Sequence, residues 1–212
     1  THREVARHRH PPTPQPPHPG TLRTKGHAMK PARSLDLTIA STPVGPLALH
    51  ALDGALVGLS LDGGHGPEHS ITRHLRRHLG ALEVRVHADA AGAATRLTRY
   101  FAGELGALDE QPVKLLGTAF QCRVWEALRA ITPGTTTSYS QLAVQLGQPK
   151  AVRAVAAANG ANPVAVFVPC HRVIASDGSL WGYGGGLPMK QWLLRHEHAR
   201  FRPLAEQGAL PL

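Results

Sequence analysis

Residues 138–160, SYSQLAVQLGQPKAVRAVAAANG, decide the fold of the second half of the chain. Ser138 or Ser140 can cap a first short helix, which Gly147 ends. Pro149 suits the start of a second helix, because its fixed backbone angle is pre-organised for a first helical turn. Two short helices joined by a tight glycine-containing turn predict a helix-turn-helix, the motif that places its second helix in a groove of DNA.

The expected second helix, residues 149–159, carries Lys150 and Arg153 near its amino end and is otherwise rich in alanine. A slim helix with small side chains can come close to a nucleic-acid groove. The same small side chains, Ala157 among them, also suit tight packing inside a helical bundle. This segment by itself leaves both interpretations open.

The apolar run NPVAVFVPCHRVIASDG, residues 162–178, sets Cys170 beside His171 and behind Pro169. Cys170 has three interpretations here: a buried structural thiol, a metal ligand, or a nucleophile with its base attached. A cysteine attacks as its thiolate, so it needs a base, and the base usually needs a third group to orient it. Glu197, in the closing helix MKQWLLRHEH, is an available carboxylate.

The composition, 42% hydrophobic and 17% charged over 212 residues, is typical of a soluble globular protein with one or two domains. Its two cysteines, Cys122 and Cys170, argue against a disulfide framework and a thiolate zinc site. We expect Cys122, on an apolar-striped helix, to be an inert buried thiol. No apolar run is long enough to cross a bilayer, and we expect a cytoplasmic protein.

Residues 1–33 form a segment rich in proline, histidine and arginine without apolar periodicity, and we predict that they are disordered. They hold seven of the lysines and arginines against one glutamate, so most of the net charge of +9 lies there. Global charge is therefore weak evidence for nucleic-acid binding. The segment lacks the apolar core of a secretory signal, and Met29 is a candidate start. A DNA-tracking arm is the less favoured interpretation.

Residues 34–112 predict a small α+β domain. Its expected strands are LDLTIAS, PLALHAL, GALVGLSL and LEVRVHA, and its expected helices are EHSITRHLRRHLG, ending on Gly80, and AATRLTRYFAGEL. His74 and His78 are spaced to bind a metal, but their arginine neighbours favour a solvated helix face. Residues 113–200 predict a mostly helical domain, in which Thr118 can cap the helix AFQCRVWEALRAI. Residues 201–212 are expected to be a tail.

Taken together, the motifs of the second half resemble those of the O6-alkylguanine-DNA alkyltransferases, also called methylated-DNA–protein-cysteine methyltransferases. The resemblance runs from Gly117 to Glu197. The matching segments follow in family order and spacing: GTAFQCRVWEAL, GTTTSYSQLA, GQPKAVRAVAAANGANP, VPCHRVI, GSLWGYGGG and KQWLLRHE. Together with the other matching segments, PCHRV is specific for this family, whereas a Cys-His pair alone is not.

The resemblance implies a DNA-repair protein that flips an alkylated guanine out of the duplex and takes the O6-alkyl group irreversibly onto its own cysteine. Flipping is physically required, because O6 cannot meet an internal thiol while its base is stacked. The family pattern also implies a ribonuclease-H-like first domain and a winged helix-turn-helix second domain. It further implies binding of double-stranded DNA through the minor groove as a monomer, without a cofactor.

The catalytic roles carry over residue by residue. Cys170 matches the alkyl acceptor, His171 the residue that takes the thiol proton through a water, and Glu197 the carboxylate that orients it. Asn162 matches a hinge asparagine that links the site to the recognition helix. Tyr139 matches the tyrosine that assists rotation of the nucleotide and protonates the departing guanine at N3.

Arg153 matches the arginine that fills the gap left by the flipped base, and its plainer interpretation is a phosphate-contacting or solvated arginine. Further DNA contacts are implied at Tyr139, Lys150, Ala154, Ala157, Asn159 and Gly160. The implied substrate pocket is lined by Val173, Trp181, Tyr183, Gly184 and Gly185. Trp181 is bulky for this loop, so it either walls the pocket against large adducts or points into the domain core.

Three other functions compete with this interpretation. A lesion-binding relative without transfer would lack the cysteine that is present here. A thiol hydrolase would need an oxyanion hole and a way to release its product. A plain helix-turn-helix transcription factor would have no need of PCHRV. The first domain lacks the Cys/His set that binds structural zinc in some relatives, so we expect no metal.

Overall fold

The computed structural model describes residues 32–66 and 68–207. The predicted disorder of residues 1–33 therefore falls almost wholly outside the described residues, as does the end of the predicted tail. Within residues 31–212 the chain forms one unit. One hydrophobic core runs through both predicted domains, from Leu47 in the sheet to Leu193 in the last long helix. The boundary near residue 112 stays a prediction.

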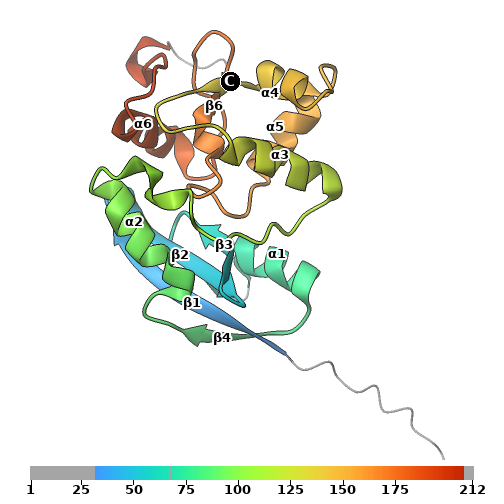
Figure 1. The fold of residues 1–212 in the computed structure, drawn as a ribbon, viewed down its shortest axis with the longest axis vertical. Helices are drawn as coiled ribbons and strands as arrows, with labels where there is room; N and C mark the ends of the chain where they lie inside the picture. Colours follow the sequence, from blue (N-terminus) through green and yellow to red (C-terminus); the bar gives the residue numbers. More distant parts are fainter. Residues whose placement is uncertain (1–31, 67, 208–212) are drawn as a thin grey trace, which may run out of the picture. The chain divides into compact units, whose positions relative to one another are not determined.

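The first half builds a four-stranded mixed sheet (Figure 1). Strands β1 (Arg33–Thr42), β2 (Gly45–Leu52) and β3 (Ala55–Ser60) form an antiparallel meander, and β4 (Leu82–Val86) lies parallel to β1 at the edge. The turn after β2 is tight because Asp53 and Gly54 both adopt positive φ, at 52° and 77°. The α+β prediction is confirmed.

Two helices cover opposite faces of this sheet. Helix α1 (Ser70–Leu79) packs through Leu75 against Leu35 and Val57, and it ends at Gly80 as predicted. Helix α2 (Ala93–Phe101) packs through Leu97 on the other face, where alternate strand residues point. Short 3₁₀ turns at Ala90–Gly92 (η1) and Leu105–Leu108 (η2) flank α2.

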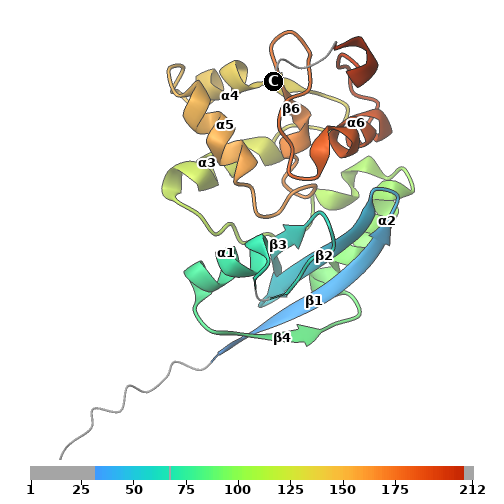
Figure 2. The same ribbon diagram turned by 180° about the vertical axis from the view of Figure 1, so that it is seen from behind.

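The second half is mostly helical and gathers at the end of the molecule away from β4 (Figures 1 and 2). In chain order its elements are α3 (Ala119–Arg129), β5 (Thr137–Ser138), α4 (Tyr139–Gln145), α5 (Val152–Gly160), η3 (Cys170–Arg172), β6 (Val173–Ile174), α6 (Gly186–His196) and η4 (Leu204–Glu206). Thr118 and Ser138 cap α3 and α4 through complete capping boxes, as their sequences predict. Strands β5 and β6 pair in parallel.

Two boundaries differ from the sequence expectations. Helix α5 begins at Val152 and not at Pro149, because Pro149 and Lys150 form a turn in which the amide of Ala151 donates to Gln148 O at 2.8 Å. Lys150 therefore precedes the helix. In the predicted tail, the amide of Arg202 donates to Gly178 O at 2.8 Å, which holds the described residues 201–207 against the domain.

Trp125 positions helix α5. Its indole Nε1 donates to Ala158 O at 2.8 Å, and the ring is fully buried between α3 and α5. Gly117 lies directly against this ring, since a Cβ at that position would sit 2.5 Å from Trp125 Cζ3. The missing side chain of Gly117 therefore lets the indole reach α5.

We predict that Gly117→Ala destabilises the fold by about 1–3 kcal/mol, because the added methyl overpacks the indole. Urea unfolding measures the change. The matched control is Gly160→Ala at the end of α5, where a Cβ meets no atom within 4 Å. It should leave stability unchanged or raise it slightly. Equal stability of the two variants would contradict the packing argument.

Candidate active site

The side chain of Asn162 closes the loop between α5 and Cys170 by bonding to backbone groups near its start and near its end. Its side-chain Nδ2 donates to Val168 O at 2.7 Å, and its Oδ1 accepts from the amide of Val164 at 3.0 Å. Inside this loop Val166 is buried and adopts φ 73°, a left-handed conformation that a β-branched residue rarely takes. The surrounding contacts therefore impose the loop conformation that delivers Cys170.

Cys170 begins the 3₁₀ turn η3 and is 6% exposed. Burial raises the pKa of its thiol, while a hydrogen bond from Asn162 and the charge of Lys190 act in the opposite direction. The net effect is a thiol that holds its proton more tightly than a free cysteine. Since the thiolate is the nucleophile, this cysteine depends on a base.

His171 is suited to be that base. It is fully buried, and burial lowers the pKa of its imidazole despite the neighbouring carboxylate, so the ring is neutral. Its Nε2 lies 3.0 Å from Glu197 Oε1. A carboxylate only accepts, so Nε2 carries the hydrogen and Nδ1 has the free lone pair. Nδ1 is buried and bonds to no residue in the described part of the chain.

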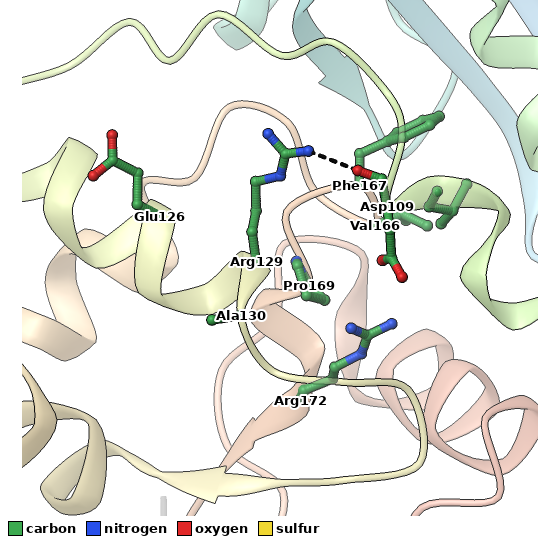
Figure 3. Close-up of a pocket in the computed structure, with 9 residues that line it drawn as sticks. Asp109, Glu126, Arg129, Ala130, Val166, Phe167, Pro169 and Arg172 are labelled. Carbon is green, nitrogen blue, oxygen red and sulfur yellow. Dashed lines mark hydrogen bonds between the residues drawn. The ribbon is translucent and has the colours of Figure 1, made fainter.

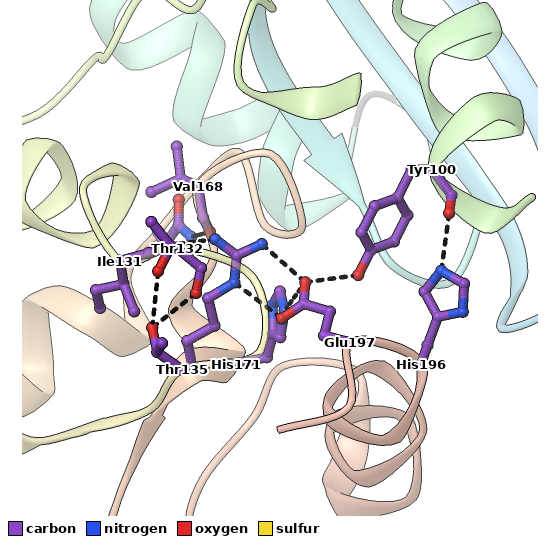
Figure 4. A network of polar contacts seen from close by, with 10 residues as sticks. Tyr100, Ile131, Thr132, Thr135, Val168, His171, His196 and Glu197 are labelled. Atoms are coloured by element: carbon purple, nitrogen blue, oxygen red, sulfur yellow. Dashed lines mark hydrogen bonds and ion pairs between the residues drawn. The ribbon is translucent and has the colours of Figure 1, made fainter. Parts of the chain in front are cut away.

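The carboxylate of Glu197 is the centre of a buried network that joins three segments (Figure 4). Arg172 donates to it twice, from Nε to Oε2 at 2.9 Å and from Nη2 to Oε1 at 2.8 Å. The hydroxyl of Tyr100, on helix α2 of the first half, donates to Oε1 at 2.7 Å. Burial raises the pKa of Glu197, but the bonds from His171 and Arg172 outweigh it and hold that pKa far below its usual range.

Sequence reasoning missed Arg172, Tyr100 and Lys190. Arg172 had a usable signal, because an arginine inside an apolar run needs a buried carboxylate partner. Lys190 had one too, since it lies on the same helix face as Leu187 and Leu194, three and four residues away. Tyr100 had none, because its partner is 97 residues away.

Lys190 links two segments beside the site through hydrogen bonds to their backbone oxygens. Its Nζ donates to Val173 O at 2.7 Å and to Trp181 O at 2.8 Å, which ties the strand after Cys170 to the glycine-rich loop. Burial lowers the pKa of Lys190 to about 8. The carbonyl of Val173, a predicted substrate contact, is therefore already engaged inside the protein.

A small cavity of about 40 Å³ reaches the thiol. This is room for about one or two waters. It is lined by Leu61, Asn159, Gly160, Asn162, Ala165, Cys170, Gly182, Tyr183 and Gly184. Two buried polar atoms, Asn159 Oδ1 and Tyr183 Oη, have no partner among the described residues. Burial and the nearby Cys170 raise the pKa of Tyr139, so its hydroxyl keeps its proton.

A larger hollow of about 370 Å³ lies beside the segment before Cys170 (Figure 3). Val166, Phe167 and Pro169 line the larger hollow together with Arg129, whose Nη2 donates to Asp109 O at 3.1 Å. Cys170 and His171 do not line it. The larger hollow is therefore not the reactive site.

Of the predicted pocket residues, Tyr183 and Gly184 line the cavity at Cys170, whereas Val173, Trp181 and Gly185 do not. Trp181 is 49% exposed, and its Nε1 donates to Ser179 Oγ at 2.9 Å. It lines a different hollow, with Asp177 and Arg202, and does not border the cavity at Cys170. Neither expectation for Trp181, a pocket wall or a core side chain, matches this position. Gly185 likewise lies outside the cavity, in a wider groove beside it.

Helix α5 presents the predicted DNA-binding side chains on one exposed face. Arg153, Ala154, Ala157 and Gly160 are exposed, as is Lys150 before the helix. Arg153 makes no hydrogen bond or ion pair with any residue that the structure describes. Asn159 differs, because it is only 4% exposed and lines the thiol cavity.

The other sequence candidates show no reactive arrangement. Cys122 is half-buried, with its Sγ 3.8 Å from Leu115 O. His78 Nδ1 bonds to the backbone oxygen of His74 at 3.0 Å. Across residues 32–66 and 68–207, no three His, Cys, Asp or Glu side chains come together to hold a metal ion. In the same ranges no helix is long and apolar enough to cross a membrane.

Residues 119–199 match the family model for 6-O-methylguanine DNA methyltransferase, DNA binding domain. The helix-turn-helix and this match thus define the class of the chain, a DNA-binding protein. Among curated relatives, the methylated-DNA–protein-cysteine methyltransferase of Mycobacterium tuberculosis is 44% identical over 160 residues, 75% of this chain and 90% of its own length. The chain belongs to the methylated-DNA–protein-cysteine methyltransferase family.

Other similarities agree with this assignment. The enzyme of the same name from Salmonella typhimurium is 52% identical over 121 residues, 57% of this chain and 70% of its own. The crystal structure of Mycobacterium tuberculosis O6-methylguanine methyltransferase has a TM-score of 0.64 at 40% identity and covers 80% of this chain and 96% of its own. The structure of Mycobacterium tuberculosis OGT in complex with DNA gives 0.63 at 38% identity, over 78% and 92%.

We predict that Tyr100→Phe lowers the free energy of unfolding by about 1.5–3 kcal/mol, because it removes a buried hydrogen bond to a charged group. Urea denaturation measures it. Tyr183→Phe is the matched control, since the hydroxyl it removes is buried without a partner among the described residues. That variant should be neutral or more stable. The Tyr100 network would be refuted by equal effects of the two substitutions.

We predict that Glu197→Gln lowers the free energy of unfolding by about 3–5 kcal/mol at neutral pH, because it leaves the Arg172 charge buried without its partner. The folded pKa of Glu197 lies below its ordinary value of 4.5. The contribution of the carboxylate to folding stability is therefore fully present above pH 4.5 and is lost progressively as the pH falls towards the folded pKa. The gap between wild type and variant should therefore shrink as the pH falls below about 5.

Unfolding curves at several pH values test this. Glu126→Gln is the control for the loss of an exposed carboxylate and should change stability by less than about 0.5 kcal/mol. A gap for Glu197→Gln that stays constant from neutral to acid pH would contradict the assignment.

Proposed function

We propose that this chain repairs DNA by moving the alkyl group of O6-alkylguanine, chiefly O6-methylguanine, onto the sulfur of Cys170. The observation that carries the proposal is a buried thiol followed directly in the chain by a buried imidazole, whose Nε2 is held by Glu197 and whose Nδ1 has no partner among the described residues. The family model and the named relatives supply the class of reaction. They do not assign the residues, which rest on the geometry.

In the proposed reaction the thiol proton passes to His171 Nδ1, directly or through a water. A sulfur–carbon bond forms as the O6–carbon bond breaks, and the bonding electron pair stays on O6. The departing guanine then takes up a proton, and we assign the hydroxyl of Tyr139, at the start of helix α4, to supply it. Glu197 stabilises the imidazolium that forms.

The product limits the protein to one turnover. A thioether has no leaving group that water displaces under mild conditions, so Cys170 stays alkylated. This favours transfer over the thiol hydrolase alternative, which needs an intermediate that water can cleave. The presence of Cys170 also disfavours lesion binding without transfer.

Access to the thiol explains the need for base flipping. The cavity beside Cys170 holds about one or two waters and is smaller than a nucleobase. A flipped guanine therefore has to displace part of the cavity wall, and Gly182 and Gly184, which flank Tyr183 in that wall, give the loop backbone freedom to move. Flipping costs a few kcal/mol, and we assign Arg153 to fill the gap left in the stack.

The alanine-lined face of α5 suits a narrow groove, and we infer that it docks in the minor groove of duplex DNA. We further infer that the protein works as a monomer in the cytoplasm. A cytoplasmic setting agrees with a reaction that needs Cys170 reduced, since thiols persist in that compartment.

The decisive experiment incubates the protein with duplex DNA carrying O6-methylguanine and digests it for mass spectrometry. The expected result is one methyl group per protein, on the Cys170 peptide. Cys170→Ala should keep lesion binding and lose transfer. Turnover beyond one equivalent, or a methyl group elsewhere, would overturn the proposal.

Arg153→Ala should slow transfer from duplex DNA by about tenfold or more, because the gap left by the flipped base is no longer filled. Single-turnover assays measure the rate. Arg123→Ala is the control, since Arg123 is an exposed arginine on helix α3. Repair by Arg153→Ala at the wild-type rate would show that another residue fills the gap.

A further inference from the structure

Helix α1 is strongly basic. Its ten residues, SITRHLRRHL, include three arginines and two histidines and no acidic residue. Arg73 and Arg77 are exposed, and neither side chain makes an ion pair or hydrogen bond with the residues that the structure describes. Both lie one turn apart, so their guanidinium groups project from neighbouring parts of one surface. The fold does not use these two charges.

The same helix forms one wall of a groove of about 570 Å³. Ser70, His74 and Arg77, at helical spacing, line it from α1. The opposite wall consists of Gly160 and Ala161 at the end of helix α5, with the glycine-rich loop beside them. The groove therefore runs between a helix of the first half and the end of the helix that carries the predicted DNA contacts.

This groove adjoins the cavity at Cys170. The two hollows share Leu61, Gly160, Asn162, Ala165 and Gly184 in their walls. A molecule bound along α5 with a nucleobase at the thiol would therefore pass directly beside the groove. The position of the groove makes it an extension of the proposed DNA surface.

The charged side chains around the groove favour an anionic occupant. Asp62 is the acidic residue in its wall, and it faces His69 Nε2 at 3.2 Å. The α1 end holds the unpaired Arg77, with Arg73 next to it on the helix. An anionic, extended occupant matches this arrangement, and the sugar-phosphate backbone of DNA is one that already lies at the adjoining surface.

Resting on the proposed function, we propose that this groove binds the phosphate backbone of the damaged DNA beyond the flipped nucleotide. Its phosphate contacts are Arg77, which lines the groove, and Arg73, which is exposed one turn earlier on α1 just outside that lining. The DNA interface then extends outside residues 119–199, which match the DNA-binding family model, onto helix α1 of the first half. Such contacts hold the duplex in register on the protein and add affinity without reading sequence.

The test compares the double variant Arg73→Gln/Arg77→Gln with a control of equal charge, Arg85→Gln/Arg195→Gln, whose exposed arginines lie on β4 and α6 outside the groove. Binding to a lesion-containing duplex is measured over a range of salt concentrations. Each lost phosphate contact flattens the slope of log affinity against log salt by about 0.9. We expect the groove variant to flatten it by up to about 1.8, and the control by much less.

A second readout separates this proposal from the proposed function. Alkylation of Cys170 by free O6-alkylguanine base, which has no phosphate, should proceed at the wild-type rate in the groove variant. Failure of the wild-type protein to transfer methyl from DNA would sink the proposed function itself. Wild-type transfer together with a groove variant whose salt slope equals that of the control would overturn the groove assignment alone. Slower reaction with the free base would also overturn it, by revealing damage to the site.

Discussion

A single buried carboxylate organises the reactive end of this molecule. Glu197 accepts hydrogen bonds from His171, Arg172 and Tyr100, and its charge survives burial only because these donors surround it. The donors come from the segment at the thiol and from helix α2 of the first half. The orientation of the imidazole therefore depends on the packing of both halves, although residues 119–199 alone match the DNA-binding family model.

The local features of the fold could be predicted from the sequence because their causes are local. Capping at Thr118 and Ser138, the end of α1 at Gly80 and the alternating strands all follow from neighbouring residues. Helix α5 began later than expected because a turn at Pro149 competes with helix formation.

The candidate site was predictable only in part. PCHRV and a downstream glutamate indicated Cys170, His171 and Glu197, and the last two are hydrogen-bonded. The contact of Tyr100 joins residues far apart in the chain, and no local pattern reports it. The outward position of Trp181 depends on the tertiary course of the glycine-rich loop, and side-chain size alone pointed elsewhere.

The small cavity at Cys170 has a consequence for how long an unused protein keeps its thiol intact. In the proposed function each molecule has one reactive thiol, and any other electrophile that reached the sulfur would consume it. Here the thiol is buried and protonated, and the space beside it admits little more than water. Selectivity thus begins with access, since only a partner that opens the wall meets the sulfur. In the unused protein, restricted access to the sulfur therefore protects Cys170 as much as the protonation of its thiol does.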